Sequence, residues 1–125
     1  MYIKCYEEFN GTILDKSVYI NWSNSRGNTS DFSNIEFIRL YRAEGSVVNR
    51  NKLPKSTRSS SGTWFTPNLK EATRYSEMST NRRIYKLDIP LVLYNNLSKL
   101  NKGGISQGEI KLPLDLSILK TPLEP

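Results

Sequence analysis

The chain of 125 residues contains one cysteine, Cys5, and no histidine. A lone cysteine cannot form an internal disulfide, so the fold must rest on a hydrophobic core, which a chain of this length can bury. Without histidine the usual zinc and iron ligand sets cannot be assembled, and Ser-His-Asp and Cys-His nucleophiles are excluded. We therefore expect one domain, residues 1–125, that is held by packing and contains no metal.

Charge and hydropathy narrow the choice of partners. The chain has 18 Lys and Arg against 12 Asp and Glu, a formal net charge of +6, which attracts anions such as phosphates and nucleic acid. The first ten residues contain no apolar stretch typical of a signal peptide, and no segment has the roughly 18 apolar residues of a membrane span. We expect no membrane contact and a cytoplasmic site of action, where a lone thiol stays reduced.

Four segments have the alternation or the composition of β-strands. They are Ile35–Ala43, Gly62–Thr66, Arg83–Leu91 and Glu109–Leu114. Residues 67–78 predict a helix with Thr66 as its cap and Pro67 in its first position. A short apolar helix or turn is expected through Leu97 and Leu100, short structured pieces before residue 35, and a loosely packed tail after residue 114. The pattern indicates a β-rich α+β domain.

Arg42 is the first candidate site residue. Strand alternation places it on one face with Ile38 and Leu40, and that face is expected to point inward. A buried guanidinium needs an anion. Either a salt bridge to Glu44 or another carboxylate, or the diphosphate of a ligand bound in a bidentate manner, meets this need.

Glu109 is the second candidate. It precedes an alternating run in which Ile110 and Leu112 are expected to face the core, so its own side chain points to the opposite face. A cleft on that face would give the carboxylate a function, although a surface glutamate at the start of a strand has the same pattern. Gln107 stands two residues earlier.

The segment Gln107-Gly108-Glu109, followed by IKLP, is similar to the Gln/Glu-x-Glu loop and strand of ADP-ribosyltransferases. Leu40-Tyr41-Arg42 resembles the first motif of the Arg-Ser-Glu branch of that family, and GTWFT at 62–66 resembles its middle strand without the Ser-Thr-Ser sequence. The three segments follow the family's order and spacing over residues 35–116. The resemblance implies a small split β-sandwich with a few short helices and with NAD in a cleft between two sheets.

The resemblance also implies a role for each motif. Glu109 is the catalytic carboxylate that stabilises the oxocarbenium-like ribosyl cation formed as nicotinamide leaves NAD. Gln107 orients the acceptor, and Arg42, beside Tyr41, binds the NAD diphosphate.

The middle segment completes the implied NAD site. Thr66 replaces the third hydroxyl group of the family's middle motif, and either Thr63 or Ser61 supplies another. Trp64 and Phe65 either stack against nicotinamide or fill the core.

These roles predict a mono-ADP-ribosyltransferase of the toxin or phage-effector kind, which transfers ADP-ribose from NAD to a macromolecule. Arginine-modifying members of the family carry a glutamate where this chain has Gln107. We therefore expect an unknown protein target that is modified on a neutral side chain rather than on arginine, and a nucleic-acid acceptor is less favoured.

Two alternative functions stay open. One is an NAD glycohydrolase of the same fold. The other is a basic nucleic-acid-binding module without catalysis. In that module Trp64 stacks on a base, and the phosphates are contacted by Arg42, Arg58 and the pair Arg82-Arg83.

Overall fold

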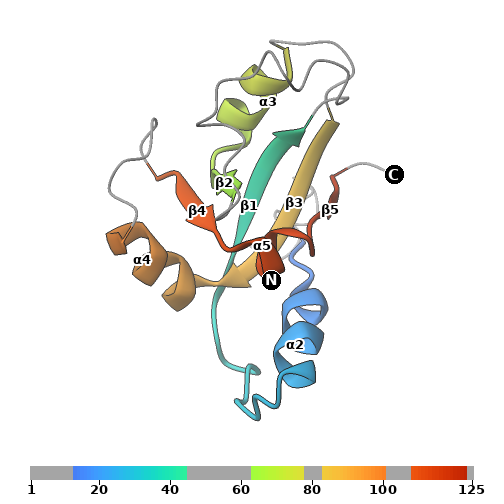
Figure 1. Ribbon diagram of the computed structural model, residues 1–125, viewed down its shortest axis with the longest axis vertical. Coiled ribbons are helices and arrows are strands. Elements are labelled where there is room, and N and C mark those ends of the chain that lie inside the picture. Colours follow the sequence, from blue (N-terminus) through green and yellow to red (C-terminus); the bar gives the residue numbers. More distant parts are fainter. Residues whose placement is uncertain (1–12, 45–62, 78–82, 101–107, 124–125) are drawn as a thin grey trace, which may run out of the picture.

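A computed structural model describes residues 13–44, 63–77, 83–100 and 108–123 (Figure 1). These residues form a mixed α+β protein with two antiparallel sheets and four helices, which confirms the α+β class, although more of them lie in helices than in strands. The larger sheet has the strand order β1-β3-β5, and the smaller one pairs β2 with β4. The strands are β1 (Phe37–Glu44), β2 (Thr63–Phe65), β3 (Arg83–Pro90), β4 (Ile110–Leu112) and β5 (Thr121–Pro122). The helices are α2 (Lys16–Ser25), α3 (Leu69–Glu77), α4 (Leu91–Leu100) and α5 (Leu114–Ser117).

The pairing of β1 with β3 forms the centre of the larger sheet. Both strands lie within two residues of their predicted bounds. The face of Leu40 points inward as predicted, but Arg42 at its end is only half-buried, and the opposite face is buried as well, since Tyr41 is 8% exposed. The buried arginine of this strand is Arg39, on the opposite face from Arg42.

Arg39 forms an ion pair with Asp88, which lies directly opposite it on β3. Its Nε and Nη2 groups donate to the two carboxylate oxygens at 2.7 and 2.8 Å, and this hydrogen bonding raises the pKa of Arg39. The carbonyl of Ile13 also accepts from Arg39, and the backbone N–H of Asp15 donates to Asp88 at 2.6 Å. The pair therefore fastens the segment before α2 to the sheet, and Asp88 is buried, at 3% exposure.

Helix α2 begins after Asp15, whose side chain accepts the backbone N–H of Ser17 at 3.1 Å. Hydrogen bonding from the Ser17 side chain is the main cause that lowers the pKa of Asp15. Tyr19 packs edge-on against Phe32 and Phe37, with ring centroids 5.7 and 6.0 Å apart. These contacts stabilise a helix whose Ser- and Asn-rich sequence has no clear helical period.

Helix α3 begins two residues later than predicted. Thr66 still belongs to the sheet, where its backbone pairs with Tyr41, so the chain cannot turn into a helix at that point. Asn68 caps the helix instead, since its side chain accepts the backbone N–H of Lys70 at 2.9 Å.

The segment after β4 is well packed, so the prediction of a loose tail is wrong. The predicted strand stops at Leu112 because Pro113 lacks an N–H, and α5 follows at once. Leu116 on α5 is 4% exposed, and Thr121 on β5 pairs with Lys86 on β3.

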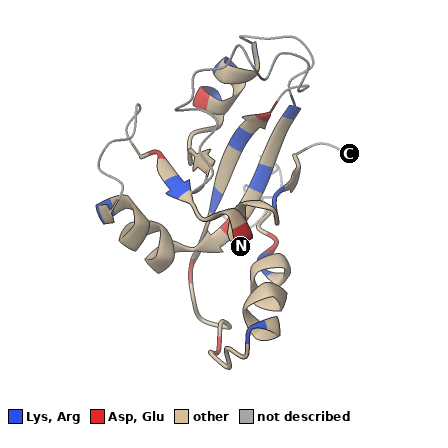
Figure 2. Cartoon of the chain, in the orientation of Figure 1, with Lys and Arg blue, Asp and Glu red and all other residues tan. Residues whose placement is uncertain are grey.

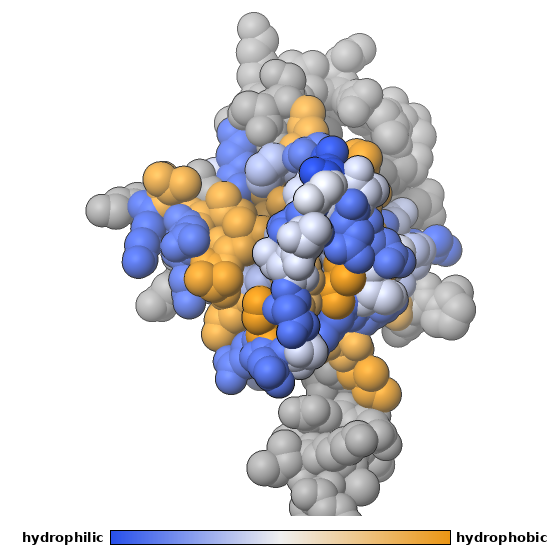
Figure 3. Space-filling model, turned by 90° about the horizontal axis from the view of Figure 1, so that it is seen from below, coloured by the Kyte–Doolittle hydropathy of each residue, from blue (hydrophilic) through white to orange (hydrophobic). Residues whose placement is uncertain are grey.

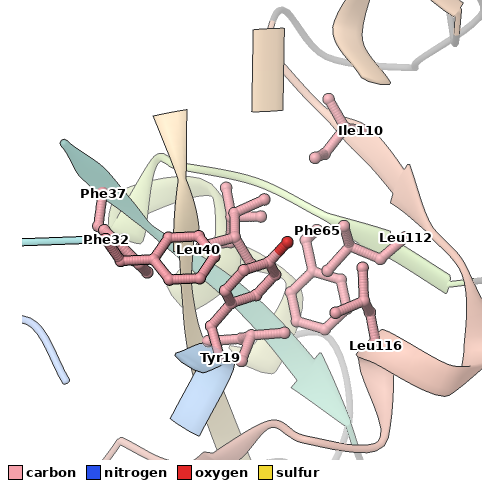
Figure 4. Packing of buried hydrophobic residues seen from close by; sticks show 10 residues of the cluster. Tyr19, Phe32, Phe37, Leu40, Phe65, Ile110, Leu112 and Leu116 are labelled. Atoms are coloured by element: carbon pink, nitrogen blue, oxygen red, sulfur yellow. The ribbon is translucent and has the colours of Figure 1, made fainter. Parts of the chain in front are cut away.

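The core connects the two sheets (Figure 4). Leu40 of β1 and Phe65 of β2 belong to one buried cluster with Leu116 of α5. Its other members are Tyr19, Phe32, Phe37, Leu87, Ile89, Ile110 and Leu112. The complete burial of Ile110 and Leu112 confirms that these two residues of β4 face the core.

Helix α4, the apolar element predicted near Leu97 and Leu100, packs against this core without burying any residue completely. Seen from below, apolar side chains gather on the side of the molecule where α4 lies (Figure 3). Val92 and Leu100 are 60% and 79% exposed there.

Candidate functional site

The three motif segments lie on neighbouring strands. Tyr41 of β1 and Thr66 at the end of β2 exchange two backbone hydrogen bonds, of 2.7 and 3.0 Å. On its other side β2 pairs with β4, with Phe65 opposite Ile110, and the same register places Thr66 opposite Glu109. The segment of the middle motif therefore lies between β1, which contains Arg42, and β4, which starts directly after Glu109.

Side chains of the small sheet divide between two faces. Phe65 and Ile110 point into the core, at 1% and 0% exposure. Alternation then places Trp64, Thr66 and Glu109 together on the other face, where Trp64 and Glu109 are half-buried. Glu109 thus lies on the face away from the core.

Arg42 has two partners at the edge of this arrangement. Its Nε group donates to Oε2 of Glu44 at 2.8 Å, which is the intramolecular salt bridge that the sequence left open. Its Nη1 group donates to the carbonyl oxygen of Trp64 at 2.9 Å, which ties the guanidinium to β2. The side chain is 24% exposed, so an anion from solvent can reach it.

The remaining motif residues have unequal access to a ligand. The Thr66 hydroxyl accepts the backbone N–H of Asn68 at 3.1 Å, whereas Oγ1 of Thr63 is buried and has no hydrogen-bond partner within the described residues. Phe65 fills the core, which is one of its two predicted roles. The Tyr41 side chain is buried, which raises its pKa, and only its backbone joins the site.

The backbone immediately before Glu109 is held in place by Tyr94 of α4. The Tyr94 hydroxyl donates to the carbonyl oxygen of Gly108 at 2.6 Å. Gly108 has a φ of +87°, and an added Cβ would lie 3.2 Å from the Tyr94 oxygen. Sequence reasoning did not find Tyr94, because nothing local connects it to a residue 14 positions away. Gln107 lies outside the described residues.

Other features of the described residues lie away from this arrangement. An open hollow of about 410 Å³ lies between α2 and residues 30–33, lined by Lys16, Ile20, Asn24 and Ser30 to Ser33. In the four described ranges, no group of three or more Cys, Asp or Glu residues could hold a metal ion. Nor does any helix there have the length and apolar character to cross a membrane. Arg58, Ser61 and Arg82 lie outside these ranges.

No family model, curated protein or solved structure matches the chain. We therefore base the proposed function on the three motifs and on where the described strands place them.

Proposed function

We propose that the chain is a mono-ADP-ribosyltransferase, with an ADP-ribosyltransferase-like split β-sandwich that binds NAD across β1, β2 and β4. The observation that supports this most is the strand order. Segments that resemble the family's three motifs are far apart in the sequence, and their described residues lie on β1, on or beside β2 and directly before β4, which are neighbouring strands. A chance resemblance of short motifs would not require them to be neighbours.

In this proposal Arg42 binds the diphosphate and Glu109 acts at the ribose. Alternation places the two side chains on opposite faces of the strands, so the dinucleotide must pass around the edge of β2 to reach both. The guanidinium is already held by the Trp64 carbonyl, so its orientation is set before the ligand arrives. The Glu109 carboxylate lies on the same face as the Trp64 ring, on which nicotinamide can stack. A negative charge beside the ribose stabilises the positive charge that develops as the bond to nicotinamide breaks.

The target is an unknown protein in a cytoplasm, modified on a neutral side chain with the help of Gln107. The same residues serve hydrolysis when water replaces the acceptor, so the experiment must separate transfer from NAD hydrolysis.

The test uses NAD labelled in its adenylate phosphate, incubated with the protein and a cell lysate. We expect a labelled lysate protein, and we expect Glu109→Gln to lower the rate of transfer by about 100-fold or more, since an electrostatic group at the transition state is lost. Binding of NAD and the melting temperature should change little, because the substitution removes charge and almost no volume.

Glu36→Gln is the matched control, since Glu36 is exposed and lies outside the proposed site. Transfer by the Glu109 variant within a few-fold of the unmodified protein would remove Glu109 from the mechanism. Free ADP-ribose without a labelled protein would identify an NAD glycohydrolase. Salt-dependent binding to an oligonucleotide without any NAD turnover would instead identify the nucleic-acid-binding module.

A further inference from the structure

One carboxylate oxygen of Glu44, at the end of β1, forms ion pairs with two cationic side chains. Its Oε2 atom lies 2.8 Å from Nε of Arg42 and 3.3 Å from Nζ of Lys120. The three side chains are 24%, 17% and 32% exposed for Arg42, Lys120 and Glu44. They are therefore shielded enough to strengthen their electrostatic interactions and still open to a solute.

Lys120 is held in this position by other contacts as well. Its ammonium lies 5.7 Å from the ring centroid of Tyr85 and 3.4 Å from the carbonyl oxygen of Ser117. Tyr85 lies directly opposite Arg42 on the neighbouring strand, so the two share a face of the sheet. Arg42 and Lys120 thus converge on one side of the sheet from distant parts of the chain.

Positive charge exceeds negative charge on this face. Arg83 lies opposite Glu44 in the register and is exposed, which adds a third cation beside the Glu44 carboxylate. Figure 2 shows this arrangement, with the acidic tip of β1 beside basic segments of β1 and β3. Among the residues that the structure describes, this shielded site therefore has more cations than anions, and such a site attracts an external anion.

We propose that Arg42 and Lys120 together bind a diphosphate group, and that Glu44 occupies the place of this anion when none is bound. The planar guanidinium of Arg42 suits bidentate contact with one phosphate, and the Lys120 ammonium contacts the other as a point charge. As the diphosphate enters, Glu44 turns away from both cations. That the diphosphate belongs to NAD rests on the proposed function, whereas the anion site itself stands on the ion pairs alone.

The test is calorimetric titration of the full chain with inorganic pyrophosphate at low ionic strength. We expect Lys120→Ala to weaken binding about tenfold, because one charge-assisted contact is lost. Lys120→Arg should retain most of the affinity. Glu44→Gln should tighten binding by about threefold or more, because the competing carboxylate is neutralised while its shape is kept. Lys86→Ala is the control, since Lys86 lies opposite Tyr41 on the other face of the sheet and should leave the affinity unchanged.

Unchanged affinity in Lys120→Ala, or weaker binding in Glu44→Gln, would overturn the proposal. Equal affinity for orthophosphate and pyrophosphate would overturn the assignment to a diphosphate.

The combined results of pyrophosphate binding and NAD turnover also separate this anion site from the proposed function. Pyrophosphate binding with the expected variant pattern but without NAD turnover would retain the anion site and reject the transferase. NAD turnover that Lys120→Ala leaves intact would retain the transferase and show that the diphosphate of NAD does not bind at this anion site.

Discussion

Arg39 and Arg42 lie three residues apart on β1 and differ in burial and in their partners. Arg39 is buried, and both oxygens of Asp88 neutralise it, so its charge serves the fold. Arg42 is half-buried, shares Glu44 with Lys120 and faces the strand of the middle motif. The alternation of a strand separates the two roles by placing the arginines on opposite faces.

The buried pair leads to a prediction about stability. Asp88→Ala should lower the free energy of unfolding by about 3–5 kcal/mol, because Arg39 is left as a buried charge without its partner. The side chains of Arg39 and Asp88 are only 8% and 2% exposed, so water cannot replace the lost carboxylate without a rearrangement. Urea denaturation of the two proteins measures the difference.

Asp115→Ala is the control, because Asp115 and its partner Arg26 are about half exposed. That pair should contribute less than about 1 kcal/mol. A loss below 1 kcal/mol in the Asp88 variant would mean that the buried pair contributes little to folding.

The sequence could not have distinguished the two arginines. A period of two assigns residues to two faces, and the run Ile38, Leu40 and Arg42 indicates one face as the inner one. The other face is covered by the chain before α2, through Ile13 and Asp15, which no local pattern of β1 reveals. Burial of both faces follows from tertiary packing and cannot be read from the strand itself.

At the scale of helices and strands, the local sequence predicted an element correctly where its alternation or its β-branched and aromatic composition was strong. The strands β1, β3 and β4 follow from their β-branched, aromatic or alternating residues. Helix α2 and strand β5 were not predicted, because α2 depends on the contacts of Tyr19 with Phe32 and Phe37, and β5 is a two-residue strand that contains a proline.

The loop between α4 and β4 allows a test of how the position of Glu109 is fixed. Gly108→Ala should lower the unfolding free energy by about 1–2 kcal/mol, because a Cβ is disfavoured at its φ of +87°. It should also lower NAD transfer, since the new Cβ presses on Tyr94 and shifts the residue before Glu109.

Gly27→Ala is the matched control. Gly27 has a similar φ of +80°, but an added Cβ meets nothing within 4 Å. It should lose similar stability and keep full transfer activity. Equal activity in the two alanine variants would show that the contact of Gly108 with Tyr94 does not position Glu109.

A second test at this scale concerns the C-terminal segment. Leu116→Ala should lower the unfolding free energy by about 2–5 kcal/mol, because Leu116 is 4% exposed and belongs to the core of both sheets. Ile118→Ala, at a residue that is 72% exposed, should change it by about 0.5 kcal/mol or less. Chemical denaturation compares the two, and equal small effects would restore the expectation of a loose tail.

At the scale of the whole molecule, the candidate site consists of contacts between distant segments. The order of the three motifs was visible in the sequence, but their adjacency depends on the Tyr41–Thr66 bridge and on the register of β2 with β4. The ion pair between Glu44 and Lys120 spans 76 residues (120 − 44) and leaves no sequence signal at all. Motif resemblance can suggest catalytic residues, whereas the partners that orient them come from the fold.

The last prediction concerns the acceptor and rests on the proposed transferase. Arginine-modifying members of the family carry a glutamate where this chain has Gln107, and that carboxylate pairs with the acceptor guanidinium. The neutral amide of Gln107 cannot supply this charge, but it can exchange hydrogen bonds with an amide or a hydroxyl group. We therefore expect mass spectrometry of the labelled protein to place ADP-ribose on asparagine, glutamine or a hydroxyl side chain. Gln107→Glu should raise the modification of free arginine analogues by about tenfold, because it restores a charge-assisted contact. Gln107→Asn keeps an amide and serves as the control. An adduct on arginine with the unmodified protein would contradict this acceptor choice, while the proposed role of Glu109 would remain.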